Sequence, residues 1–172
     1  MSQVLRGWLA FAAIGTAVIH LALVISSPAP LAVVLVLLGV VEFAWGILTL
    51  ARDRILFPRA ARIGAMAPVL LWSLVVVLAT LLDAPSVASY FNFVPMFVAT
   101  VFQLFIALSI TTVLRAGART AKAASSGRYL LGLLAGALVV AALTAPALSF
   151  TTAGSVDPQA AHFFTGTGHA GH

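Results

Sequence analysis

Long, almost uncharged hydrophobic segments alternate with short polar segments along this chain. Each hydrophobic segment is close to the roughly 20 apolar residues that a helix needs to span a bilayer. The segments lack the alternating polar positions of a half-solvated strand, and in lipid the backbone must satisfy its own hydrogen bonds. The pattern therefore predicts five transmembrane helices, at residues 8–26, 31–51, 64–82, 93–114 and 129–150.

The composition supports this interpretation. Apolar residues make up 62% of the 172-residue chain and charged residues only 8%, whereas soluble domains contain about 25% charged residues. So few charges cannot cover a water-facing surface, which indicates an all-α integral membrane bundle over residues 1–150 and a short tail over residues 151–172. In such a protein the formal charge of +5 does not indicate nucleic-acid binding. The chain has no cysteine, which excludes disulfides, thiolate metal sites and iron–sulfur clusters.

The distribution of basic residues predicts the topology. Short loops rich in Lys and Arg stay on the cytoplasmic side of a membrane. Here the basic residues precede the first predicted helix or lie in the second and fourth connections, while the first and third connections have none. With five spans, the N-terminus is then inside and the C-terminal tail outside the cytoplasm. The basic residues, in these three groups, are Arg6; Arg52, Arg54, Arg59 and Arg62; and Arg115, Arg119, Lys122 and Arg128.

The tail contains candidate metal ligands. His169 and His172 are separated by two residues, and His162, Asp157 and the terminal carboxylate can add further ligands. Imidazole nitrogen and carboxylate oxygen without sulfur suit copper or zinc. A glycine-rich tail that contains histidines can equally be solvated and bind nothing, so both interpretations stay open.

Four polar side chains fall inside the predicted spans. Glu42 lies about 16 Å from the outer end of its helix at a rise of 1.5 Å per residue. Gln103 and Ser73 fall at similar depths, and His20 is closer to the outer end. An acid within a span is costly and by default marks a functional site. The group either relays a proton or binds an ion, or a protonated Glu42 bonds to Gln103 or Ser73 and holds the helices together.

Other chemistries are not indicated. His20 is the only histidine within the spans, which excludes a bis-histidine haem. The chain has no phosphate-binding loop for a nucleotide, and it has neither a nucleophile–base pair nor paired carboxylates, so we expect no enzyme acting alone. Gly132 and Gly136 have the spacing that lets two membrane helices approach closely, which predicts helix packing there.

A succession of short motifs covers the first half of the chain. It comprises "IHLAL", "EFAWG" followed by "LARDR", and "PVLLWSL". In these motifs the chain resembles small multi-pass membrane proteins of high-GC bacteria whose function is not known. The resemblance implies a bacterial membrane protein and no particular activity. Together with the helical spans and the basic loops, it leads us to expect a location in the bacterial cytoplasmic (inner) membrane.

Three functions are compatible with these features. The first is a membrane-anchored, metal-handling protein whose outer tail binds copper or zinc, beside a membrane metalloenzyme. The second is a non-catalytic accessory subunit of a larger respiratory or oxygenase complex, whose tail docks on other membrane-protein subunits. The third is a small transporter that uses Glu42.

Overall fold

The computed structural model describes residues 2–52, 55–83, 93–116 and 125–153. This part of the chain is helical and contains no strand. Its five α-helices are each long and apolar enough to cross a membrane, which confirms the predicted helical fold. The elements are α1 (Gln3–Leu23), the 3-10 helix η1 (Val24–Ser26), α2 (Ala29–Ala51), α3 (Pro58–Leu81), α5 (Phe93–Ala116) and α6 (Ser126–Ser149).

The helices extend further into the basic segments than the hydropathy pattern predicts. α3 begins at Pro58 rather than near residue 64, so Arg59 and Arg62 belong to the helix and not to the loop before it. Proline is favourable at the first helical position because its missing N–H would have no partner there. A long arginine side chain at a helix end keeps its aliphatic stem in apolar surroundings while its charge reaches water.

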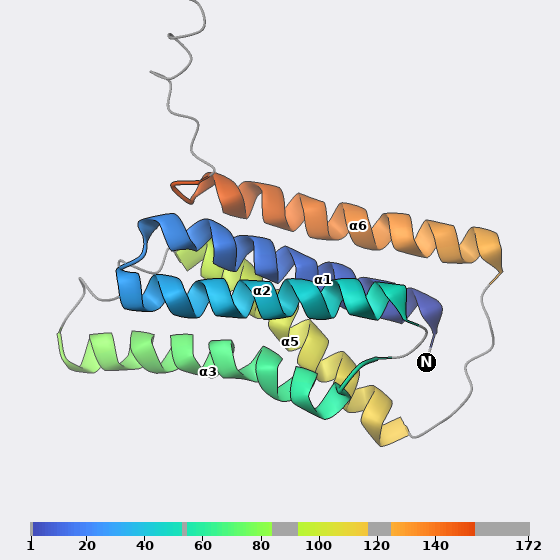
Figure 1. The fold of residues 1–172 in the computed structure, drawn as a ribbon, viewed down its shortest axis with the longest axis horizontal. Coiled ribbons are helices and arrows are strands. Elements are labelled where there is room, and N and C mark those ends of the chain that lie inside the picture. The colour runs from blue at the N-terminus through green and yellow to red at the C-terminus, as the bar shows by residue number, and fades with distance from the viewer. Residues whose placement is uncertain (1, 53–54, 84–92, 117–124, 154–172) are drawn as a thin grey trace, which may run out of the picture.

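Helix α1 lies in the middle of the bundle (Figure 1). α2 and α6 pack on two sides of it and α5 crosses against it, while α3 packs on α5 at the edge of the bundle. Accordingly, α1 is the most buried span, and the outward faces of α2, α3 and α6 carry exposed leucine, valine and phenylalanine side chains. An apolar outward face of this extent suits lipid chains and indicates a multi-pass membrane protein.

The backbones of α1 and α2 approach closely at two glycines. An added Cβ at Gly39 would lie 3.2 Å from the carbonyl oxygen of Ala17, and one at Gly46 would lie 3.1 Å from that of Ala10. Gly39 and Gly46 are seven residues apart on α2, as Ala17 and Ala10 are on α1, so these contacts fix the antiparallel register of the two helices. Glu42, between the two glycines, consequently faces the middle of α1.

The predicted packing glycines of α6 contact α1. The indole Nε1 of Trp8 donates a hydrogen bond of 2.8 Å to the carbonyl of Gly132. A Cβ at Gly132 would lie 2.7 Å from a methyl group of Val4, and one at Gly136 would lie 2.9 Å from the Trp8 nitrogen. The two glycines therefore bring α6 onto α1 within a single chain.

Candidate functional site

The centre of the bundle holds a carboxyl group paired with a histidine. His20 Nδ1 on α1 lies 2.8 Å from Glu42 Oε2 on α2. Side chains of a helix tilt toward its own N-terminus. Because α1 and α2 are antiparallel, the His20 and Glu42 side chains tilt toward each other along the bundle, which lets them meet although their depths in the two helices differ.

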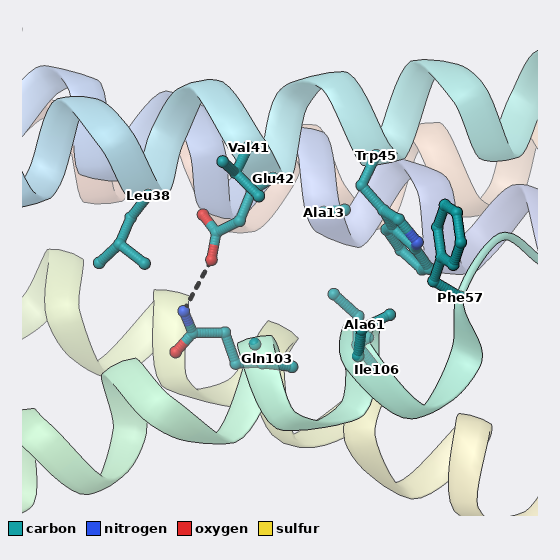
Figure 2. A pocket seen from close by; sticks show the side chains of 12 residues that line it. Ala13, Leu38, Val41, Glu42, Trp45, Phe57, Ala61, Gln103 and Ile106 are labelled. Carbon is teal, nitrogen blue, oxygen red and sulfur yellow. Dashed lines mark hydrogen bonds between the residues drawn. The ribbon is translucent and has the colours of Figure 1, made fainter.

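The second oxygen of Glu42 bonds to another helix. Gln103 on α5 donates from its amide Nε2 to Glu42 Oε1 at 3.0 Å (Figure 2). Gln103 is 2% exposed, so it is fixed within the packing of α1 and α5. The carboxyl group thus joins three helices, and hydrogen bonds of this kind between membrane helices each contribute roughly 0.6–2 kcal/mol.

Ser73 does not belong to this group. Its hydroxyl donates to the carbonyl of Val69, one turn earlier in α3, at 2.8 Å. The residue lies on the exposed side of its helix. The structure therefore brings together His20, Glu42 and Gln103, which we call the polar cluster, and leaves out Ser73.

A cavity of about 280 Å³ lies beside the polar cluster, between α2, α3 and α5. Among the described residues that line it, Glu42 is the only one with an ionisable side chain. Its side chain is 15% exposed, whereas that of His20 is 1% exposed, so the carboxyl group is the accessible member of the pair. The remaining lining is almost entirely apolar and consists of Ala13, Leu38, Val41, Trp45, Phe57, Ala60, Ala61, Gly64, Ala65 and Ile106, beside Gln103.

Two aromatic side chains form the end of the cavity nearest the α2–α3 connection. Trp45 lies next to Phe57 in Figure 2, away from the carboxyl group. The indole Nε1 of Trp45 donates to the carbonyl of Leu56 at 2.9 Å, which fixes the ring. Phe57 has a φ of 47°, a left-handed conformation that is uncommon for a bulky residue. A residue before proline ordinarily adopts an extended conformation, so the left-handed conformation of Phe57 is uncommon for this reason as well.

Sequence reasoning did not identify the aromatic end of the cavity. One signal was present, since Trp45 follows Glu42 by three residues and residues with this spacing share a helix face. Phe57 gave no comparable signal, because its position depends on the turn before α3.

The candidate metal ligands of the tail, Asp157, His162, His169 and His172, lie outside the described residues. Among the residues that are described, no three or more His, Cys, Asp or Glu side chains gather in a way that could hold a metal ion. Metal binding by the tail therefore stays a prediction, as does the tail's docking on a partner.

Comparison of the chain with protein-family models, with curated proteins and with solved structures gives no match.

Proposed function

We propose that this protein is a small membrane transporter in which Glu42 binds the transported cation or proton. One observation carries the proposal: the carboxyl group of Glu42 is hydrogen-bonded to side chains of two other helices and still faces a cavity. A carboxyl group that served only to join helices would need no free space beside it, whereas one that exchanges a ligand needs a cavity that the ligand can enter.

The arrangement suits the exchange of a proton for another cation at the carboxyl group of Glu42. If the His20 imidazole donates from Nδ1 and the Gln103 amide from Nε2, both carboxylate oxygens act as acceptors. The carboxylate can then neutralise one positive charge at a time, either a proton on oxygen or a cation in the cavity. Binding of one displaces the other, which is the elementary step of an exchanger.

The proposed function predicts that Glu42→Gln abolishes transport. Glutamine keeps the shape of the side chain but can neither ionise nor carry a proton. In liposomes containing the purified protein, an outward gradient of potassium, sodium or tetraethylammonium ions, each tested in turn, drives protons inward by exchange, and an enclosed pH-sensitive dye reports the flux. We expect the flux of the Glu42→Gln variant to fall to that of protein-free liposomes.

Ser73→Ala is the matched control for the flux measurement, because Ser73 is an intramembrane polar residue that bonds only within its own helix. Its flux should equal that of the unsubstituted protein. A Glu42→Gln flux equal to that of the Ser73→Ala control would contradict the proposal.

For the orientation, we propose that the N-terminus faces the cytoplasm, that the tail lies outside and that the membrane is the bacterial cytoplasmic membrane. The arrangement of the helix ends supports this. The N-terminus, the ends of α2 and α5 and the starts of α3 and α6 lie at one end of the bundle (Figure 1). The basic residues of the described segments all lie at these helix ends, as expected for the cytoplasmic side.

The orientation predicts opposite labelling at the two ends of α6. Because the chain contains no cysteine, single cysteines can be introduced at the exposed positions Ser125 and Ala153. A membrane-impermeant maleimide should label Ala153→Cys in intact bacterial spheroplasts. It should label Ser125→Cys only after the membrane is permeabilised. The reverse pattern would overturn the orientation and, with it, the outer location of the tail.

A further inference from the structure

We infer that the cavity beside Glu42 binds a lipophilic organic cation, that is, a bulky apolar ion such as an aryl-substituted phosphonium or a quaternary ammonium. The inference rests on the proposed function and names the substrate class for it. Three features of the cavity carry it: its charge, its aromatic end and its open side.

The charge of the cavity favours a cation. In the form that we infer to bind a cation, the imidazole and amide are neutral donors and Glu42 carries the one negative charge of the polar cluster. The other lining residues that the structure describes carry no charge. An anion would be repelled by the carboxylate, and a neutral ligand would leave the charge without a counter-ion in an apolar environment.

The aromatic end favours an organic cation over a metal ion. Trp45 and Phe57 present aromatic rings to the same cavity as Glu42, and aromatic rings attract organic cations through their negative faces. A small inorganic ion would need several oxygen ligands to replace its hydration shell. Among the described lining residues, only Glu42 and Gln103 have side-chain oxygens, which are too few for that.

The open side of the cavity lies between α2 and α3. Although both helices line the cavity, no Cα atom of α2 comes within 8 Å of a Cα atom of α3. Val41 on α2 and Gly64 on α3 line the cavity and are also exposed on the lipid-facing surface of the bundle. A ligand that dissolves in the bilayer can therefore reach Glu42 between these helices. A hydrophilic ion would first have to lose its hydration to follow this route.

Phe57 lies at the margin of the cavity in a conformation that the turn enforces. It is 76% exposed although it is a large apolar residue. Uncommon backbone conformations persist where the surrounding structure determines them, and they concentrate at ligand sites. A bulky apolar ligand in the cavity would cover this ring.

Binding of tetraphenylphosphonium tests the inference. The purified full chain in nanodiscs of zwitterionic lipid is equilibrated with the radiolabelled ion, and nanodiscs without protein give the background. We expect saturable binding. Glu42→Gln should weaken it by about tenfold or more, and Trp45→Leu by about tenfold, as befits loss of a counter-charge and of a desolvated cation–π contact.

Controls separate these effects from misfolding. Trp72→Leu removes a tryptophan of α3 that does not line the cavity and should leave binding unchanged. Trp45→Phe keeps an aromatic ring but loses the bond to Leu56, and should retain most of the binding. Triphenylmethane, a neutral molecule of similar shape, should not compete.

Binding that is equal in the unsubstituted protein and in Glu42→Gln would overturn the inference, as would absence of saturable binding or full competition by triphenylmethane. The two proposals can fail separately. Glu42-dependent proton flux without phosphonium binding would refute the substrate class alone. Glu42-dependent phosphonium binding without flux would refute transport and leave the binding site.

Discussion

Replacing His20 with leucine should destabilise the protein more than replacing all three members of the polar cluster with apolar residues. In His20→Leu, the Oε2 of Glu42 loses its partner in a site where water has little access, which we expect to cost about 3 kcal/mol in free energy of unfolding. In the triple variant His20→Leu, Glu42→Met and Gln103→Met, no polar atom is left unpaired, and the side-chain volumes change little.

The free energy of unfolding of the triple variant should therefore lie within about 1 kcal/mol of the unsubstituted value. Unfolding in mixed micelles with increasing sodium dodecyl sulfate, followed by tryptophan fluorescence, gives these free energies. Ser73→Ala serves as the control for loss of a membrane-embedded hydroxyl outside the cluster. If the triple variant were less stable than His20→Leu, the polar cluster would be a net source of stability. Its presence would then be explained by folding alone and would not support a role in transport.

The sequence predicted the spanning helices well because their signal is local. Apolar length and lack of charge require no knowledge of the neighbouring helices. The ends were less well predicted, since α3 continues through Arg59 and Arg62 to Pro58. The mean hydropathy falls at such charges and therefore places the start of the helix too late. An arginine at the end of a span can nevertheless extend its charge to the interface.

The depth of a residue along its helix predicted part of the polar cluster, but it did not predict which side chains face each other. Counting residues placed Glu42, Gln103 and Ser73 at similar depths, and Glu42 does bond to Gln103. The count says nothing about rotation around the helix axis, and α3 turns Ser73 outward. His20 was expected nearer the outer end, but the tilt of side chains in antiparallel helices brings it to Glu42.

The cavity could not be predicted from the pattern of residues. It exists because α3 packs on α5 and does not approach α2, although α2 and α3 are consecutive and joined by a short connection. Consecutive helices that are joined by a short connection usually pack against each other. Nothing in the apolar faces of α2 and α3 indicates this separation, because both faces suit lipid and protein equally.

Engineered cysteine pairs should report the separation of α2 from α3 directly, since the chain has no cysteine of its own. An added Cβ at Gly46 would lie 3.5 Å from the Cβ of Ala13, within the range of about 3.5–4.5 Å found in disulfides. The added Cβ also lies 2.9 Å from a side-chain carbon of Ile14 and 3.1 Å from the Ala10 carbonyl oxygen, so α1 and α2 must move apart slightly, which still leaves the two Cβ atoms within disulfide range. Ala13→Cys with Gly46→Cys should thus form a disulfide between α1 and α2 when a mild oxidant is added. Val41→Cys with Ala61→Cys, across the cavity, should not, because the Cα atoms of α2 and α3 are more than 8 Å apart.

The measurement is the gel shift of the protein after oxidation, denaturation in sodium dodecyl sulfate and reaction with maleimide-polyethylene glycol, which adds mass to free thiols only. The pair at positions 13 and 46 should resist the shift, while the pair at positions 41 and 61 and all single-cysteine variants should shift fully. A flexible bis-maleimide should protect the pair across the cavity, because its length spans the distance that a disulfide cannot. Rapid disulfide formation at positions 41 and 61 would mean that α2 and α3 close on each other, and it would remove the route from the bilayer to Glu42.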